Sequence, residues 1–426
     1  MDASSQHTRQ PPTMSSDSTP NAQTASGEVT AMPDSYKQPE APTPSEAVPR
    51  TNLEDLQYRD PHHYPPNILE ASSQHTVSAL ATKIYTLSYL VLFSLFGTLA
   101  RVGLTALTSY PGAPVFTTVW ANVGGSFIMG FLTEDRMLFR HEWGRAVYDE
   151  AIRARKDGED LSAAKKAHLA TKKTIPLYVG LATGFCGSFT SFSTFLRDVF
   201  LAASNDLPVP GGGFTTHRNG GYSFMALLGV LVTDITLSLG AYTMGSHLAA
   251  ATEGLLPSLP FHFTRKILDR VAVVLGWGCW LGAVFLSIFP PHDHWRGQIT
   301  FALVFAPIGC LGRFYLAMYL NAKRPSFPLG TFAANIIGTA ILAIGWDVAH
   351  VPAGGVITCQ VMQGLEDGLC GCLTTVSTWV AELHTLRRKH SYIYGAASVI
   401  TGFALMIIIM GGLRWSQGFH PLLCKI

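Results

Sequence analysis

The sequence predicts an all-α integral membrane protein with nine transmembrane helices, arranged as two four-helix repeats and one linker helix. Three observations predict this class. Only 14% of the 426 residues are charged, against roughly 25% in soluble domains. Apolar stretches long enough to cross a bilayer, which takes about 20 residues, recur from residue 81 onward. Finally, three polar motifs occur twice along the chain in the same order.

Residues 1–80 form a polar segment that contains 11 of the 25 prolines. No apolar run in it could offset the entropy lost on ordering the chain. The segment also lacks a basic region followed by an apolar stretch, so no cleaved signal peptide is evident. We therefore expect a disordered tail on the cytoplasmic side.

Composition and cysteine spacing exclude several classes of function. The formal net charge of +2 gives no indication of a nucleic-acid partner. The seven cysteines lie in or beside apolar segments without the spaced Cys/His pairs of a zinc site, which predicts buried thiols and neither a disulfide framework nor metal ligands. No set of nucleophile, base and orienting group recurs and no ATP-binding loop is present, so we do not expect an enzyme.

Nine apolar stretches are predicted to cross the membrane. Their boundaries follow the change from apolar to polar composition. The predicted spans are Ile84–Thr108, Ala113–Thr133, Ile175–Leu196, Tyr222–Ser246, Val271–Phe289, Ile299–Leu320, Leu329–Ala349, Gly355–Leu383 and Ile393–Leu413.

Charge in the loops sets the predicted orientation. The loops on the side of the N-terminus carry eighteen Lys and Arg residues, ten of them between 134 and 174. The opposite side carries Arg218, Arg296, Arg414 and Lys425. Because cytoplasmic loops are rich in Lys and Arg, the N-terminus is predicted in the cytoplasm and, after nine crossings, the C-terminus outside.

Three strings in the first half are matched in the second half in the same order, which indicates duplication. The third pair is identical at six of twelve positions, and the second pair aligns Asn122 with Asn335. The pairs are Gly97–Arg101 with Gly309–Arg313, Thr117–Phe127 with Gly330–Ala340, and Gly184–Phe195 with Gly368–Trp379.

The two repeats must run in opposite directions across the membrane. Four crossings return the chain to its starting side, so the fifth span makes the second repeat begin from the opposite side. Inverted repeats of this kind place their binding elements near the midplane, between the halves. We expect a first repeat at 81–246, a linker with the fifth helix at 247–291, and the second repeat at 292–426.

Polar side chains inside the spans are the candidate functional residues. Arg101 and Arg313 either attract an anion or tie down helix ends. Asn122 and Asn335 either hydrogen-bond neighbouring helices or donate their amide N–H groups to a permeating anion. The residues leave both alternatives open in each case.

The third span of each half carries glycines followed by a Thr/Ser cluster, a pattern that favours a break in the helix. Such breaks are tolerated where protein or a water-filled cavity satisfies the freed backbone groups, and two related breaks could point carbonyl groups at one central cation. Alternatively, the glycines only permit close helix packing. The residues are Gly184, Gly187, Thr190, Ser191, Ser193 and Thr194, with Gly368, Gly371, Thr374, Thr375, Ser377 and Thr378.

Phe192 and Phe195 lie three residues apart and so share one helical face. Such a pair commonly serves packing. The positive edges of aromatic rings can also meet an anion without the strong attraction of a lysine.

On these residues the sequence resembles the fluoride channel family, in its two-domain eukaryotic form, over residues 84–414. The resemblance rests on Gly-x3-Arg, the Asn of span two, and the string Gly187–Phe195. It implies a passive fluoride channel with a structural sodium ion held by carbonyl groups of Gly187, Thr190, Gly371 and Thr374. It also implies an anion pathway lined by Phe192, Phe195, Asn122, Asn335, Tyr394 and Ser398. We expect the Thr and Ser residues that follow the breaks, including Thr194 and Thr378, to add a ladder of hydroxyl groups to this pathway.

Departures from the family pattern predict a single working pore. In the second half Val376 and Trp379 replace the two phenylalanines, and in the first half Val232 and Thr236 stand where Tyr394 and Ser398 stand in the second. Asp234, opposite Ala396 in the repeat, either repels an anion or is a neutral packing residue. Asp198 and Glu382 lie at the ends of the third helices. There they either line the entrance to the pathway or are simply exposed to water.

The resemblance also implies fluoride and membrane lipids as partners, location in the plasma membrane, and one chain that is equivalent to a bacterial dimer. The alternative is a proton- or sodium-coupled transporter of another small solute, in which Asp234, Glu366 and Asp367 would carry protons.

Overall fold

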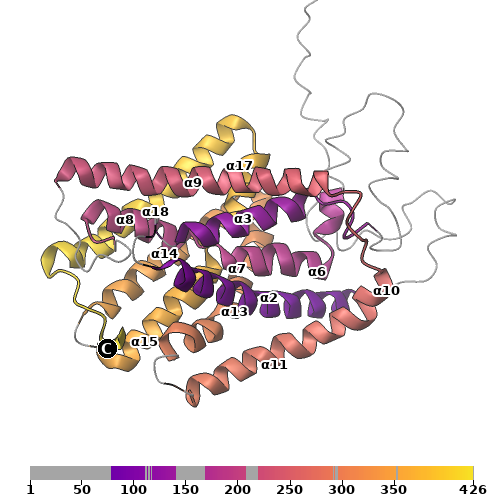
Figure 1. Cartoon of the computed structure of the whole chain (residues 1–426), viewed down its shortest axis with the longest axis horizontal. Helices are drawn as coiled ribbons and strands as arrows, with labels where there is room; N and C mark the ends of the chain where they lie inside the picture. Colours follow the sequence, from indigo (N-terminus) through magenta and orange to yellow (C-terminus); the bar gives the residue numbers. More distant parts are fainter. Residues whose placement is uncertain are drawn as a thin grey trace, which may run out of the picture. The chain divides into compact units, whose positions relative to one another are not determined.

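The computed structural model describes residues 78–110, 113, 116, 118–140, 168–207, 219–290, 292, 296–351 and 354–425. Within these ranges every regular element is a helix, as the sequence predicts (Figure 1). The predicted tail, up to residue 77, and residues 141–167 of the predicted charged loop lie outside the described residues.

Seven described helical segments are long and apolar enough to cross a membrane: 79–108, 176–204, 220–251, 261–288, 301–323, 329–349 and 388–416. The other two predicted spans coincide with α3 and with α15 to α17. In the described residues α3 has only 17 residues, and the last predicted span but one is interrupted after α16. The structure therefore confirms an all-helical protein with several helices that could cross a membrane.

Caps in the sequence account for where the helices of the first part begin and end. Pro176 occupies the first turn of α6, where its missing N–H is not needed. The Asn219 side chain accepts a bond from Tyr222 N and starts α9, and Asn205, at a φ of 66°, ends α8. The elements are α2 (Ala79–Thr108), α3 (Thr118–Glu134), α6 (Pro176–Val179), the π-helical η5 (Gly180–Cys186), α7 (Gly187–Phe189), α8 (Phe192–Ser204) and α9 (Gly220–Ala251).

The linker helix packs against α2 through polar contacts. It consists of α10 (Phe261–Phe263), the π-helical η6 (Thr264–Leu268) and α11 (Asp269–Ile288). Trp277 Nε1 donates to Ser88 Oγ of α2 at 3.0 Å, and Tyr89 OH donates to Asp269 Oδ1 at 3.1 Å. Most of the outer face of α11 is exposed and apolar, as a lipid-facing helix should be.

The second part repeats the order of the first, with a long helix, a second long helix, an interrupted helix and a final long helix. Its elements are η7 (Arg296–Thr300), α13 (Phe301–Leu320), the 3-10 turn η8 (Asn321–Lys323), α14 (Leu329–Ala349), α15 (Gly355–Gly364), the π-helical η10 (Leu365–Cys370), α16 (Gly371–Leu373), α17 (Ser377–Thr385), α18 (Arg388–Ser416) and η11 (Leu423–Lys425).

The interrupted helix of the first part lies at the centre of the bundle. In the most apolar stretch of residues 176–204, 83% of the residues are buried. The corresponding stretches of residues 261–288 and of α9 are only 17% and 22% buried. The outer helices therefore face lipid, and the breaks lie inside protein, where their backbone groups can find partners.

The prediction of seven buried thiols is wrong for one pair, which is bonded, and for Cys279, which is exposed. Cys359, in the middle of α15, and Cys424 of η11 form a disulfide, although they are 65 residues apart in sequence. The fold brings them together because the segment after α18 folds back onto the end of α14: Phe419 packs on Trp346 and His350, and His420 N donates to His350 O. Cys279 is exposed on α11, and the other four cysteines are buried thiols.

Candidate functional site

Two helix breaks meet in the middle of the bundle. After α7 the backbone of Thr190 is extended, with ψ 150°, and α8 begins two residues later. After α16 the backbone of Thr374 is extended in the same way, with ψ 157°, and α17 begins three residues later. Both breaks fall within the Gly-x-x-Thr strings in which the sequence predicts them.

Each break caps the helix that follows the other break. Thr190 Oγ1 accepts from the backbone N–H groups of Val376 at 3.2 Å and Ser377 at 3.1 Å, at the start of α17. Thr374 Oγ1 accepts in turn from Ser193 N at the start of α8, at 3.1 Å. Because free N–H groups at a helix start need acceptors, the two breaks stabilise one another.

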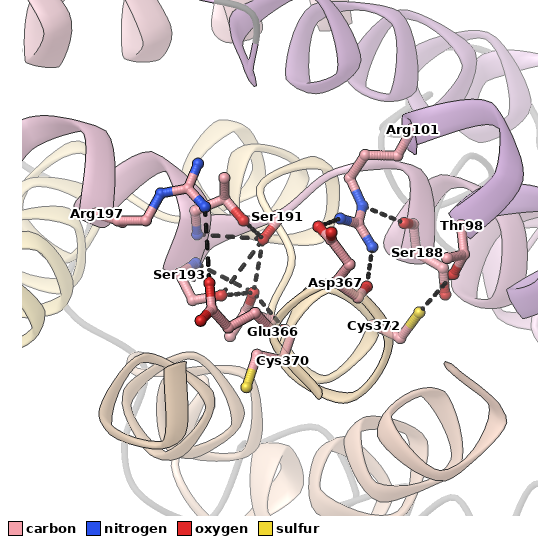
Figure 2. Close-up of polar contacts among 12 residues, drawn as sticks. Thr98, Arg101, Ser188, Ser191, Ser193, Arg197, Glu366, Asp367, Cys370 and Cys372 are labelled. Carbon is pink, nitrogen blue, oxygen red and sulfur yellow. Dashed lines mark hydrogen bonds and ion pairs between the residues drawn. The ribbon is translucent and has the colours of Figure 1, made fainter. Parts of the chain in front are cut away.

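A cluster of buried hydroxyl groups surrounds these caps. Thr190 Oγ1 lies 3.1 Å from Thr375 Oγ1, and Ser193 Oγ lies 3.0 Å from Thr374 Oγ1. Ser191 Oγ lies 2.8 Å from Thr194 Oγ1. Figure 2 shows Ser191 and Ser193 in this cluster, which joins residues from both halves of the chain. Of the two predicted Thr positions beyond the breaks, only Thr194 contributes its hydroxyl here; Thr378 donates its backbone N–H to Thr375 Oγ1 at 3.4 Å.

Asn122 of α3 and Asn335 of α14 bind the backbone of the two breaks. Asn122 Oδ1 accepts from Ser191 N at 2.9 Å, and Asn335 Oδ1 accepts from Thr375 N at 2.8 Å. In a continuous α-helix these N–H groups would donate to the carbonyl groups four residues earlier, which are those of Gly187 and Gly371. The asparagines therefore leave both glycine carbonyl groups without their helical donors.

The amide nitrogens of the two asparagines have different partners. Asn122 Nδ2 donates to both carboxylate oxygens of Asp234 in α9, at 3.1 and 3.0 Å, and Asp234 is 1% exposed. Asn335 Nδ2 donates to the backbone carbonyl of Thr375 at 3.3 Å. The polar surroundings of the two asparagines are thus unequal, and the difference comes from Asp234.

Arg101 and Arg313 reach across to the interrupted helices. Arg101 Nε donates to Ser188 O at 3.2 Å and Nη1 to Asp367 Oδ1 at 3.1 Å, while Nη2 donates to Asp367 O (Figure 2). Arg313 Nε donates to Cys372 O at 2.8 Å and Nη2 to Thr183 O at 2.9 Å. Both guanidinium groups are buried and bind carbonyl groups of both halves, among them those of Thr183 and Asp367 within the π-helical segments.

Only glycine fits beneath each guanidinium group. A Cβ atom at Gly371 would overlap the Arg101 guanidinium, and one at Gly187 would overlap that of Arg313. The two glycines of the Gly-x-x-Thr strings therefore have a packing role as well as a position at the breaks.

A second charged group lies beside the first break. Arg197 of α8 pairs with Asp198 at 3.0 Å. Its guanidinium group also lies 4.0 Å from Glu366 Oε2 of η10, a contact drawn in Figure 2. The guanidinium group also stacks over the Trp346 ring at 5.3 Å. The acidic residues that the sequence left open, Glu366 and Asp367, are thus each paired with an arginine.

The predicted aromatic pair is buried and its rings meet edge to face. The Phe192 and Phe195 ring centroids lie 5.8 Å apart at an interplanar angle of 70°. The Phe192 ring also lies 5.4 Å from Trp379, which holds the position of Phe195 in the second half. Val376 and Trp379 are each 1% exposed.

Tyr394 of α18 belongs to a polar group that the sequence did not predict as a set. Tyr394 OH donates to Glu382 Oε2 at 2.7 Å, and Thr331 Oγ1 donates to Glu382 Oε1 at 2.6 Å. Ser398 Oγ donates to Tyr394 O at 2.8 Å. The sequence names Glu382 together with Asp198, since an acid stands eleven residues after the break glycine in both halves, but it does not predict Tyr394 and Thr331 as the partners of Glu382.

The predicted pathway residues fall into two groups according to helix packing. Besides α9, which follows it in sequence, the helix α8 with the aromatic pair packs on α14 and α18, which carry Asn335, Tyr394 and Ser398. The helix α17, with Val376 and Trp379, packs on α3 and α9, which carry Asn122 and Asp234. The first group contains the aromatic pair, Asn335, Tyr394 and Ser398, whereas the second keeps an asparagine but has Val376 and Trp379 in place of the two phenylalanines.

A buried lysine closes the end of α3. Lys172 Nζ donates to the carbonyl groups of Leu132, Thr133 and Asp135 at 2.8, 2.8 and 2.6 Å. Burial lowers the pKa of Lys172 to about 8, against the attraction of Asp135 and Glu134. Burial also raises the pKa of Asp135, whose backbone bonds and Lys172 act in the opposite direction. The lysine replaces the donors missing at a helix C-terminus.

Two segments of the chain match one known protein family. A profile of the CrcB-like protein family (Camphor Resistance, CrcB) matches residues 88–245 and 300–412. The chain belongs to the CrcB-like family. The two matched segments contain both breaks, both asparagines and both arginines described above.

Named relatives of this family member are fungal and bacterial. Fluoride export protein 1 of Neurospora crassa is 57% identical over 373 residues, which cover 83% of this chain and 71% of that protein. Fluoride export protein 1 of Candida albicans is 34% identical, covering 76% of this chain and 79% of the relative. The fluoride-specific ion channel FluC of Pseudomonas paraeruginosa is 33% identical over 128 residues, 29% of this chain and 98% of that protein. No solved structure matches the chain.

Proposed function

We propose that this chain is a passive, highly selective fluoride channel, which exports cytoplasmic fluoride down its electrochemical gradient and so gives resistance to fluoride. Relatives named for fluoride export that share most of the chain support this function. The observation that carries it in this chain is the meeting of the two breaks, where hydroxyl, amide and aromatic groups of both halves lie together inside the membrane-spanning bundle.

Transport through such a channel needs no energy-coupling machinery. Fluoride that enters as the neutral acid dissociates in the cytoplasm and is trapped as an anion. With the cell interior negative, each expelled charge gains about 2.3 kcal/mol per 100 mV. A narrow path whose hydroxyl, amide and ring-edge groups replace the hydration shell of fluoride excludes the larger chloride ion.

The pathway between α8, α14 and α18 conducts, and the pathway between α3, α9 and α17 does not. The first combines Phe192 and Phe195 with Asn335, Tyr394 and Ser398. In the second pathway, the Asn122 amide nitrogen donates to both carboxylate oxygens of the buried Asp234. This amide is therefore not available to fluoride, and a carboxylate repels an anion. Paired substitutions test this assignment. Phe195→Ala and Asn335→Asp should abolish fluoride efflux, whereas Val376→Ala, at the position of Phe192 in the second half, should leave most of it; equal losses in both pathways would contradict a single pore.

A sodium ion fits the centre of the crossing. The candidate ligands are the carbonyl groups of Gly187, Thr190, Gly371 and Thr374. No described donor bonds to any of them, and the asparagines divert the helical donors of the two glycines. Carbonyl oxygens suit a hard cation, and such an ion would supply a fixed positive charge that binds the two breaks together. Among the described residues no group of His, Cys, Asp and Glu side chains could hold a metal ion.

The chain crosses the membrane nine times as 4+1+4, with the two repeats inverted, the N-terminus in the cytoplasm and the C-terminus outside at the plasma membrane. Two family matches in one chain support two repeats, and a single chain would correspond to a bacterial dimer. The disulfide between Cys359 and Cys424 supports the orientation, because disulfides form in oxidising compartments and both cysteines then lie on the outer side.

Flux measurements test the function against its alternative, a transporter coupled to protons or sodium. The reconstituted full chain should release fluoride from liposomes when a membrane voltage is imposed, with no proton or sodium gradient. Chloride release under the same voltage should stay at the level of empty liposomes. Fluoride release that requires one of the gradients would favour the transporter and refute the channel.

A further inference from the structure

A groove of about 500 Å³ opens on the outside of the bundle, above α17 and between α9 and α18. On α9 it runs past Leu231 and Leu239, and on α18 it extends from Arg388 to Ile400. Trp379 of α17 lines it as well. Except at one end, its lining is almost wholly apolar.

The groove faces the acyl chains of the bilayer. Its two long walls belong to helices whose outer surfaces are exposed and apolar, as shown by Val232 at 52% and Ile400 at 67% exposure. Such surfaces of a membrane protein are covered by lipid, because exposed apolar residues of a spanning helix face hydrocarbon. Anything that fills the groove must therefore be apolar over most of its length.

The length of the groove matches one leaflet. From Arg388 to Ile400 the helix α18 advances twelve residues, or about 18 Å at the α-helical rise. Half of the bilayer hydrocarbon core is about 15 Å. A single extended acyl chain with its polar end at Arg388 would thus occupy the groove and stop near the midplane.

The polar end of the groove is strongly basic. Arg387, Arg388 and Lys389 are consecutive and exposed, and none of the three forms an ion pair with a described acid. His384 adds an exposed imidazole, whose ring centroid lies 5.2 Å from that of Tyr242 at an interplanar angle of 50°. The neighbouring Glu382 carboxylate accepts hydrogen bonds from Thr331 and Tyr394 and forms no ion pair with these three basic residues.

We propose that this groove is a binding site for an anionic glycerophospholipid, which lays one acyl chain between α9 and α18 and its phosphate group beside Arg387, Arg388 and Lys389. Basic clusters at the end of a spanning helix attract anionic headgroups, and the orientation proposed above puts this end in the cytoplasmic leaflet, where anionic lipids are enriched. The polar tail 1–77 lacks an apolar run to fill the groove. The proposal does not depend on which ion the chain conducts.

Native mass spectrometry of the full chain tests the proposal. The protein is extracted from vesicles of equal parts phosphatidylserine and phosphatidylcholine, and the retained lipid is counted. The wild type should keep one phosphatidylserine molecule in clear excess. Replacing Arg387, Arg388 and Lys389 with Gln should lower that excess at least tenfold, since each basic group contributes to attraction of the headgroup. The matched control replaces Arg270, Lys323 and Arg324, exposed basic residues on the same predicted side, and should keep the lipid.

A second variant tests the apolar part of the site. Ala396→Trp should fill the groove and displace the lipid, whereas Gly282→Trp on the lipid face of α11, which has no neighbour within 4 Å, should not. Equal retention of the two lipids by the wild type, or unchanged retention in both groove variants, would overturn the proposal. So would a lipid-free dimer, which would make a second copy the occupant, or a cross-link from the tail to the groove.

Discussion

Replacing Gly371 with alanine should destabilise the protein through Arg101. A Cβ atom at this position would overlap the Arg101 guanidinium group, which is buried and donates to both the carboxylate and the carbonyl of Asp367. The guanidinium must therefore move away from Asp367. Hydrogen bonds that involve a charged group contribute about 1.5 to 3 kcal/mol each, so loss of these two should lower the free energy of unfolding by about 3 kcal/mol or more.

The matched control lies on the helix that carries Arg101. A Cβ atom added at Gly103 would meet no neighbour within 4 Å, and alanine inside a helix is about 0.5 to 1 kcal/mol more favourable than glycine. In thermal unfolding of the purified protein in detergent, Gly371→Ala should lower the midpoint and Gly103→Ala should hold or raise it. Equal midpoints for Gly371→Ala and the wild type would refute the idea that the glycine makes room for the arginine.

Three further predictions concern other parts of the fold. Cys359→Ser should lower the unfolding free energy by about 2 to 4 kcal/mol, and an external reductant should lower the wild-type midpoint to the same value without affecting the variant; insensitivity of the wild type would argue against the disulfide. Asn122→Asp should reduce the yield of folded protein by facing Asp234 with a second carboxylate, and adding Asp234→Asn should restore it; a stable single variant would contradict this pairing. Because the folded pKa of Lys172, about 8, lies below its unfolded value of 10.5, the folded state disfavours the charged form, so wild-type stability should rise relative to Lys172→Met between pH 8 and about 10.5. A constant difference across that range would mean that the pKa is not lowered.

The sequence predicted the helices and their breaks well because both depend on local composition. The span Leu329–Ala349 coincides with α14, and the span Tyr222–Ser246 lies inside α9. Both breaks fall at the Thr of the Gly-x-x-Thr string, where small and hydroxyl residues give the helix little support. Repeat matching then identified which polar residues to examine.

Contacts between distant segments could not be predicted in this way. Cys359 and Cys424 stand in no motif, and only the return of the chain after α18 brings them together. The sequence allowed Asn122 to serve either helix packing or an anion, but its bond to Ser191 N depends on how α3 crosses the break. In the same way, the partners of Arg101 lie in both halves of the chain, and nothing in the composition of α2 specifies them.

The central claim, a passive pore selective for fluoride, is tested most directly by a reversal potential. The purified full chain is placed in a planar bilayer with a tenfold fluoride gradient and equal chloride on both sides. We expect a reversal potential of about 59 mV, the value for a tenfold gradient of one charge, and no shift when a tenfold chloride gradient is added. A reversal potential near zero, or one that follows chloride, would contradict the claim.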